Sequence, residues 1–292
     1  MITPAARSTE PARRRSGTIA AHAVMALFVV YFLLPFWWLL VAATKDNDGL
    51  FGSHPLWFAD LHLFDNLRLL FTQDDGLYLR WLGNSALYAV TSGVGATAIA
   101  ALAGYAFAKL RFPGRNALFA LLLGLIMVPA TALVLPTYLL MAEAGLINSV
   151  WAVILPSLLN PFGVYLLRVY AHDSVPDEML EAARIDGAGE LRVFRSVALP
   201  AMRPALVTVL LFSMVATWNN FFLPLVMLSD QNLYPLTVGL RSWYLSATIG
   251  NGGPALFNVI VVGSLVAIVP LIVAFLLLQR YWRGGLTIGA LK

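Results

Sequence analysis

The 292-residue sequence contains no cysteine, and only 12% of its residues are charged. The first absence excludes disulfides, thiolate metal sites and cysteine nucleophiles. The charged fraction is about half that of a soluble domain. Because 60% of the residues are hydrophobic, the composition excludes a soluble globular enzyme and a disordered chain. It is the composition of a membrane protein.

The hydrophobic residues are gathered in six long runs that contain no Asp, Glu, Lys or Arg. Each run is long enough to cross a hydrocarbon layer of ~30 Å as a helix. The runs are continuously apolar, whereas the strands of a β-barrel would alternate apolar and polar residues. We therefore predict an all-α integral membrane protein with six transmembrane helices, at residues 19–43, 81–108, 116–140, 147–167, 204–228 and 256–279.

The basic residues are distributed unequally between the two sides of these helices. Fifteen of the 19 Lys and Arg residues fall in the two termini and the second and fourth loops, and four fall in the other loops. The positive-inside rule then predicts that both termini are cytoplasmic. The net charge of +4 is thus a sign of topology and does not indicate nucleic acid. We expect a disordered basic tail at 1–15, an extracytoplasmic loop at 44–80, a cytoplasmic loop at 168–203 and a cytoplasmic tail at 281–292.

The predicted helices carry no charge in their middle, where proton pumps and ion-coupled carriers need relays or ion sites. His54 and His62 lie together in one outer loop but lack the spacing of metal ligands. We therefore expect no metal site, and an energy source that lies outside this chain. Polar residues within the helices, notably Asn84, Asn219 and Asn220, have two interpretations. They bond helix to helix, or they line a hydrated path for an uncharged polar solute.

The fourth loop contains a short amphipathic helix. Ser174 and Asp177 have the spacing of a capping box, and Gly187 is a helix stop. Between them we expect Met179, Leu180, Ala182 and Ala183 on one side, and Asp177, Glu181 and Arg184 on the other. A two-faced helix outside the membrane favours docking to another protein, and the alternative is a helix that lies on the lipid surface.

Within this loop, Glu181-Ala182-Ala183 is followed by Gly187, Val197 and Leu199-Pro200. This pattern resembles the EAA signature of importer-type ABC transporter permeases, with Val197 in place of the usual Ile. Further matches of the same kind, in the same order, extend from about residue 80 to the end. They are NSALYAV (84–90), GYAFAKLRFPGR (104–115), MVP (127–129), LPTYLL (135–140), GLINS (145–149), WNNFFLPL (218–225) and QRYWRGGLTIGALK (279–292). The group that the chain resembles is the maltose-type carbohydrate importers.

The resemblance implies a type I ABC importer permease fold, with its core at residues 81–280, in the inner or plasma membrane of a prokaryote. It implies a sugar or related polar solute as substrate. The implied partners are a second permease subunit as heterodimer, two ATPase subunits and an extracytoplasmic sugar-binding protein. The chain has no Gly-x-x-x-x-Gly-Lys-Ser/Thr loop, so ATP and Mg are expected on the partner ATPase, with no cofactor in this chain. We therefore expect a transporter subunit and no enzyme.

The resemblance also implies roles for individual residues. Glu181 would make a polar or ionic contact inside a cleft of the ATPase. The other residues of the implied coupling surface are Met179, Ala182, Ala183, Asp186, Gly187, Leu199 and Pro200. The alternatives are a stand-alone carrier or channel, or a membrane-embedded enzyme. The predicted spans lack the residues that either alternative would need.

The outer loop at 230–254 is rich in aromatic residues. Tyr234, Trp243 and Tyr244 are expected to anchor either a binding protein or the lipid headgroups.

Overall fold

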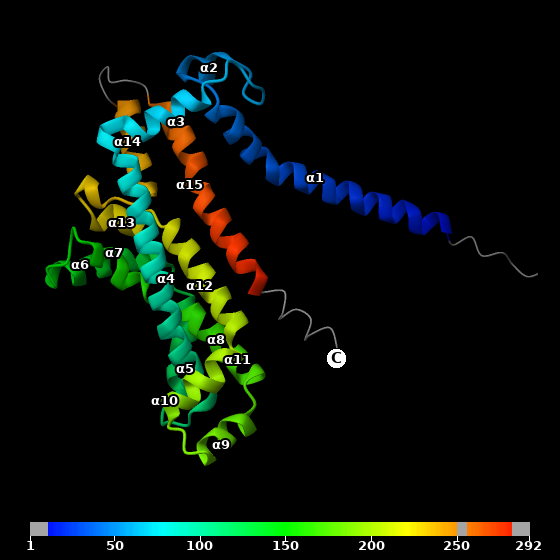
Figure 1. The fold of residues 1–292 in the computed structure, drawn as a ribbon, viewed down its shortest axis with the longest axis vertical. Coiled ribbons are helices and arrows are strands. Elements are labelled where there is room, and N and C mark those ends of the chain that lie inside the picture. The colour runs from blue at the N-terminus through cyan, green and yellow to red at the C-terminus, as the bar shows by residue number, and fades with distance from the viewer. Residues whose placement is uncertain (1–10, 250–255, 282–292) are drawn as a thin grey trace, which may run out of the picture.

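The computed structural model describes residues 11–249 and 256–281, and every regular element in these ranges is helical (Figure 1). The elements of the first half are α1 (Pro11–Ala43), α2 (Asn47–Gly52), α3 (Leu63–Thr72), η1 (Gln73–Gly76), α4 (Leu77–Lys109), α5 (Arg115–Ile126), η2 (Ala130–Leu133), α6 (Val134–Glu143) and α7 (Val150–Ser157). Those of the second half are α8 (Pro161–Ser174), α9 (Asp177–Ile185), α10 (Glu190–Val193), the π-helical turn η3 (Phe194–Ala198), α11 (Leu199–Ala201), α12 (Arg203–Trp218), α13 (Phe222–Met227), η4 (Gln231–Leu233), α14 (Leu236–Ile249), α15 (Phe257–Leu278) and η5 (Gln279–Tyr281).

The central helix is α4, which runs through the body beside α8 and α12 (Figure 1). Small residues let the three helices approach closely. A Cβ on Gly104 would lie 2.8 Å from Cβ of Leu167 in α8, and one on Gly93 would lie 2.5 Å from Cγ of Met214 in α12. Close backbone approach through Gly and Ala is the usual way in which membrane helices pack. The small-residue run of α4 therefore forms the core of the fold.

Four helical segments are long and apolar enough to cross a membrane: Ala21–Ala43, Leu63–Lys109, Val150–Ser174 and Phe257–Tyr281. Two further pairs pass the same test only when each is taken as one broken span. Arg115–Ile126 and Ala130–Glu143 are bent by 100°, and Glu190–Ala201 and Arg203–Trp218 are bent by 82°. The structure therefore has four to six spans, and the predicted span 116–140 is not one continuous helix.

Proline explains where these two breaks fall. Pro129 comes directly before η2, and Pro200 and Pro204 flank Met202, where α11 gives way to α12. Because proline has no N–H and crowds the preceding turn, a helix bends or ends there. The predicted span 204–228 is likewise divided, since α12 ends at Trp218 and α13 begins at Phe222.

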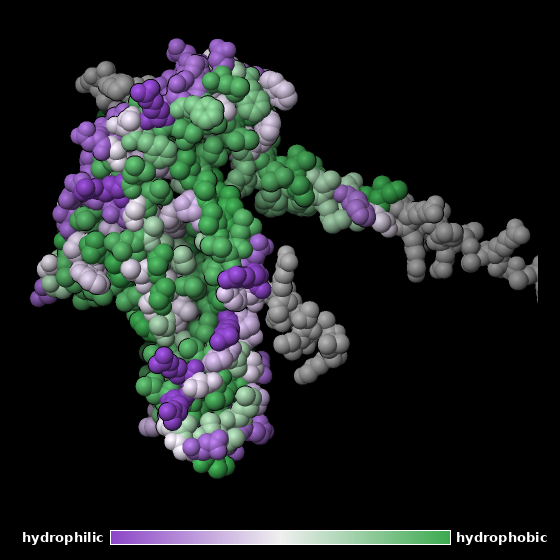
Figure 2. Space-filling model, viewed as in Figure 1, coloured by the Kyte–Doolittle hydropathy of each residue, from purple (hydrophilic) through white to green (hydrophobic). Residues whose placement is uncertain are grey.

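Helix α1 leaves the body and packs against α15 near its own carboxyl end (Figure 1). Val41, Ala42 and Ala43 are buried there, whereas side chains before them, such as Leu27 and Phe32, are more than 60% exposed. Figure 2 shows the resulting hydrophobic surface along α1 and along the middle of the body. The helix begins at Pro11, so residues 11–15, which we expected in a disordered tail, are helical. Residues 1–10 and the tail from 282 lie outside the described residues.

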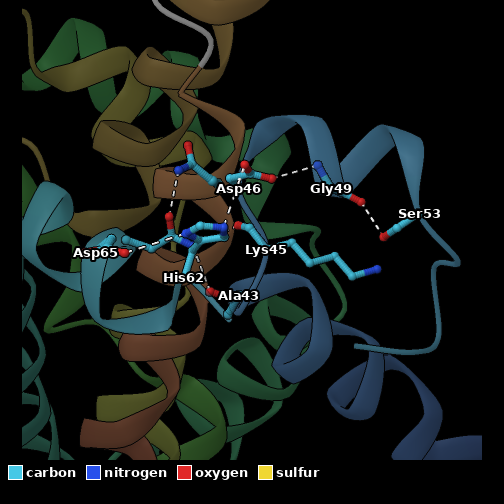
Figure 3. A network of polar contacts seen from close by, with 9 residues as sticks. Ala43, Lys45, Asp46, Gly49, Ser53, His62 and Asp65 are labelled. Atoms are coloured by element: carbon cyan, nitrogen blue, oxygen red, sulfur yellow. Dashed lines mark hydrogen bonds and ion pairs between the residues drawn. The ribbon is translucent and has the colours of Figure 1, made fainter. Parts of the chain in front are cut away.

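A polar network joins the carboxyl end of α1 to α3 and to the amino end of α15, and part of it is drawn in Figure 3. The side chain of Asn66 donates to the carbonyls of Ala43 and Lys45 at 3.0 and 2.8 Å, and Asn258 of α15 donates to Asn66 at 2.7 Å. His62 lies between the carboxylates of Asp46 and Asp65. The loop 44–80 is thus largely ordered helix, held to both α1 and α15.

The residues after α13 form a turn, 229–236, that is fastened to residues 81–88 of α4. Trp81 donates from Nε1 to the carbonyl of Gln231 at 2.8 Å, and the hydroxyl of Tyr88 donates to the carbonyl of Leu233 at 2.8 Å. The hydroxyl of Ser85 accepts from the backbone N–H of Leu236 at 2.8 Å. These three side chains, all from α4, help to hold the turn, which is called the outer turn below.

Trp243 was expected to anchor a partner or the lipid headgroups, and this expectation is wrong. Its side chain is 4% exposed, its ring lies 4.6 Å from that of Trp81 between centroids, and its Nε1 donates to Asp74 at 2.8 Å. A tryptophan whose apolar ring and N–H are both satisfied inside the chain has no free group for a partner. Tyr244 remains 42% exposed.

Candidate functional site

Helix α9 lies at the end of the body remote from the outer turn, between α8 and α10 (Figure 1). The predicted capping box is wrong. Ser174 belongs to the last turn of α8, where its hydroxyl donates to the carbonyl of Tyr170 at 2.6 Å, and the residue before α9 is Pro176, which makes no side-chain cap. Asp177 and Glu178 instead place negative charge in the first turn of α9, which the helix dipole favours.

The carboxyl end of α9 has the geometry that the sequence predicts. Gly187 has φ +82°, in the left-handed region. Its N–H donates to the carbonyl of Arg184, and the N–H of Ala188 donates to that of Ala183, both at 3.0 Å. These two bonds form a Schellman motif, which satisfies the last helical carbonyls. Asp186 is the exposed C-cap residue before this turn.

The two faces of α9 are not the ones expected. Leu180 is 2% exposed and Ala183 is half-buried, and both pack into the core cluster around Tyr105 and Phe194. Met179 is 52% exposed and Ala182 is also exposed, so neither joins Leu180. The reason is spacing, because residues three apart share one face of a helix and Leu180 and Ala183 take the inner one.

The outward surface of α9 therefore combines a carboxylate with small and apolar groups. It consists of Met179, Glu181, Ala182 and Ile185, called the α9 outer face below. All four are exposed. Ile185 is 86% exposed, and the sequence prediction omitted it. The sequence could have indicated this position, because Ile185 follows Ala182 by three residues and residues at that spacing share one helical face.

Two ion pairs hold α9 in place. Nζ of Lys109, the last residue of α4, lies 2.7 Å from Oδ1 of Asp177, and this bond holds the pKa of the Asp177 carboxyl below its usual value. Arg184 makes two bonds, of 2.7 and 3.1 Å, to the carboxylate of Glu190, which lower the pKa of Glu190. The sequence prediction missed Lys109, because the contact joins residues 68 positions apart.

The remaining residues of the predicted coupling surface lie farther along the loop. Leu199 is half-buried and packs on the core cluster that holds α9, and Pro200 beside it is exposed. Both follow the π-helical turn η3, in helix α11. Leu199 is therefore connected to α9 through the shared core.

The three asparagines predicted for a path are placed apart from α9. The amide of Asn84 donates to the carbonyls of Asn232 and Tyr234 at 2.8 and 3.0 Å, so its donors hold the outer turn. Asn219 is exposed and donates to the carbonyl of Val215 at 2.9 Å, and Asn220 accepts from the N–H of Leu223 at 3.4 Å. Each amide thus makes at least one bond within the chain. No group of three or more His, Cys, Asp or Glu residues suited to a metal occurs in the described ranges.

Comparison with known proteins identifies the family. Residues 93–282 match the family model described as "Binding-protein-dependent transport system inner membrane component". The chain is 37% identical over 228 residues to the arabinooligosaccharides transport system permease protein AraQ of Halalkalibacterium halodurans, covering 78% of this chain and 79% of the relative. It is 32% identical to AraQ of Bacillus subtilis over 94% of this chain and 95% of the relative. It is 29% identical to the sn-glycerol-3-phosphate transport system permease protein UgpE of Yersinia pestis over 94% and 97%.

The fold has a counterpart among solved structures. A chain from the crystal structure of a bacterial ABC transporter involved in the import of the acidic polysaccharide alginate superposes with a TM-score of 0.80. The match covers 96% of this chain and 100% of that chain, at 24% identity. It supports the fold alone, whereas the family match covers more than half of the sequence. The chain belongs to the family of binding-protein-dependent transport system inner membrane components, and it is an ABC transporter permease.

Proposed function

We propose that this permease forms half of the transmembrane path of an ATP-driven importer, and that α9 is the element through which a partner ATPase drives it. The observation that supports the second part most directly is the α9 outer face. Glu181 and Ile185 project from a helix whose opposite side is sealed into the core by Leu180. A helix that is firmly held on one side and exposed on the other is suited to enter a groove in a partner.

The residues of the α9 outer face have complementary tasks in this proposal. Glu181 supplies a charge for a polar or ionic contact, and Ala182 allows close approach of the partner surface. Met179 and Ile185 bury apolar area at either side. Gly187 and Asp186 set the turn that follows, while Ala183, Leu199 and Pro200 support the helix through the core cluster and its edge.

The substrate is proposed to be a sugar or related polar solute delivered by an extracytoplasmic binding protein. Two relatives are named for arabinooligosaccharides and one for sn-glycerol-3-phosphate. These names support a carbohydrate or a related polar solute as substrate, and the uptake assay below would identify the individual compound. Asn219 and Asn220 are the proposed contributors to the path near the break between α12 and α13. Asn84 is proposed with them, although its amide donors already bind the outer turn.

The proposed complex contains this chain, a second permease subunit, two ATPase subunits and the binding protein, in the membrane of a bacterium. ATP and Mg would bind the ATPase subunits. The loop 168–203 and both termini would be cytoplasmic, and 44–80 would lie outside, as the positive-inside rule predicts. The exposed hydrophobic surface of α1 would then contact lipid or the second permease.

The test is reconstitution of this chain, the second permease and the ATPase subunits in proteoliposomes, with the binding protein added outside. We expect substrate-stimulated ATP hydrolysis and substrate uptake that both require this chain. Glu181→Ala should lower uptake by at least about tenfold, because loss of an interfacial charge contact costs about 2 kcal/mol or more and about 1.4 kcal/mol already corresponds to a factor of ten. Asp173→Asn, at another exposed carboxylate of the segment 168–203, is the matched control and should behave as wild type. Uptake that continues without ATPase subunits would contradict the proposal and favour a stand-alone carrier.

A further inference from the structure

The ion pair between α4 and α9 joins two very differently exposed partners. The side chain of Lys109 is 6% exposed, whereas that of Asp177 is 73% exposed, and 2.7 Å separates Nζ from Oδ1. The carbonyl oxygen of His172 lies 3.5 Å from the same Nζ. An enclosed ammonium group is stable only beside an opposite charge or hydrogen-bond acceptors. Lys109 therefore holds Asp177 at one place, at the first turn of α9.

The other contacts of α9 do not supply this restraint. Leu180 and Ala183 bind the helix to the core through apolar contacts, which are non-directional. Arg184 braces the far end of α9, but its partner Glu190 belongs to α10 and not to α4. In the part of the chain that the structure describes, the pair of Lys109 and Asp177 is the one ion pair that ties α9 directly to α4.

Helix α4 carries this restraint to the opposite end of the molecule. Its 33 residues span roughly 50 Å at 1.5 Å per residue. Near its other end, Trp81, Asn84 and Tyr88 donate four hydrogen bonds to carbonyls of the outer turn. A continuous helix that is fastened at both ends can pass a displacement from one to the other.

We propose that Lys109 is a positioning residue that locks α9 to α4, so that movement of α9 by the ATPase also moves α4 and the outer turn. This inference rests on the proposed function, because it concerns how the same coupling helix transmits force. In this proposal Lys109 acts on coupling through α9, and it need not contact the ATPase.

The first test measures ATP hydrolysed per substrate molecule imported, in the reconstituted complex. Lys109→Met and Asp177→Asn should each raise this ratio by up to about fivefold, the factor that corresponds to loss of an ion pair with one exposed partner. The double variant should be no worse than either single variant, since both remove one contact. Lys109→Arg should retain most coupling. The control is Asp173→Asn, because Asp173 is 72% exposed and pairs with the neighbouring His172 instead of α4.

A second test replaces the ion pair with a reversible covalent link. Because the chain has no cysteine, the two cysteines of the double variant Lys109→Cys/Asp177→Cys can be joined selectively. The link is a short bifunctional thiol-reactive reagent that forms a disulfide with each cysteine. Coupling should be poor before the link forms, return when it forms and fall again after reduction. A role confined to protein stability would change membrane abundance and thermal stability, and a link would not restore the ratio in molecules that are already folded.

The outcomes separate this inference from the proposed function. If Lys109→Met keeps the wild-type ratio, or if the covalent link fails to restore coupling, Lys109 is not a positioning residue. The proposed function would still hold if Glu181→Ala lowered uptake as expected. If the wild-type complex shows no substrate-stimulated ATP hydrolysis, the proposed function itself fails.

Discussion

At the scale of single residues, two glycines of α4 illustrate opposite requirements. A Cβ on Gly104 would lie 2.8 Å from Cβ of Leu167 and 2.9 Å from the backbone nitrogen of Arg168. Nothing lies within 4 Å of the equivalent position on Gly83. The first glycine is therefore required by the approach of α8, and the second leaves room for a side chain.

We expect Gly104→Ala to lower the thermal stability of the purified permease, because backbone atoms of α8 cannot give way as a flexible side chain can. Overpacking of this kind costs about 1–3 kcal/mol. Gly83→Ala should be neutral or should stabilise α4, by up to about 1 kcal/mol of helix propensity. Thermal unfolding of both variants in the same detergent checks the pair, and equal stabilities would show that α8 can move away from α4 to make room for the added methyl group.

Gly187 differs from both, because its requirement comes from the backbone. Its φ is +82°, and no atom lies within 4 Å of the place that a Cβ would occupy. Gly187→Val should therefore strain the turn by about 1–2 kcal/mol without a steric clash. Uptake should be lost while the amount of permease in the membrane is unchanged, as measured by immunoblot and transport assay. Full uptake by this variant would remove α9 from the coupling pathway.

The sequence predicted local features at this scale and missed those that depend on tertiary contacts. The left-handed Gly187 was predictable, because a glycine after a short helix has few other roles. Ser174 was assigned wrongly, since its hydroxyl bonds back to Tyr170 inside α8, an alternative that serine always has. The contacts of Lys109 and Trp243 could not be predicted, because their partners Asp177 and Asp74 lie far away in the sequence.

At the scale of elements, apolar run length located the membrane helices but could not determine their shape. The long uninterrupted runs became α1, α4 and α15. Proline marks the bends near 129 and near 200–204, but a run that is apolar on both sides of Pro129 looks the same whether the chain continues or bends by 100°. The same limit applies to α9, whose existence was predicted but whose inward face depends on which core it meets.

The contact between α9 and α4 should depend on acidity in a definite direction. The Lys109 bond lowers the pKa of Asp177 below the ordinary value of 3.8, so the contact stabilises the folded loop above that value and is lost as the pH falls through the lower, folded-state pKa. We expect the loop to be insensitive to pH from about 5 to 8 and to loosen below about pH 4. Fluorescence of a probe on a cysteine at 182 would report the change.

The control for this prediction is Asp177→Asn, which removes the titrating carboxyl. The variant should be loosened at neutral pH and should lack the acid transition below about pH 4. An acid transition of equal size in the variant would assign it to other carboxyls, such as Glu190, whose pKa is also lowered.

At the scale of the whole molecule, the proposed function requires that α9 lie on the cytoplasmic side of the membrane and that residues 44–80 lie outside. A cysteine at 191 should be labelled by a membrane-impermeant thiol reagent only from the cytoplasmic side, and a cysteine at 68 only from the outside. Leu191 and Arg68 are both exposed, so access to the reagent is matched. Labelling at 191 in intact cells would reverse the orientation and place α9 on the wrong side for an ATPase.

The central claim is that the α9 outer face docks to an ATPase, and crosslinking within the assembled complex tests it most directly. Glu181→Cys should form a crosslink to the ATPase subunit through a short thiol-reactive reagent. Gln231→Cys, exposed on the outer turn at the opposite end of the molecule, should form none. This account predicts a crosslink at 181 whose yield changes with ATP binding. A complex that hydrolyses ATP in response to substrate but gives no crosslink at 181 would contradict it.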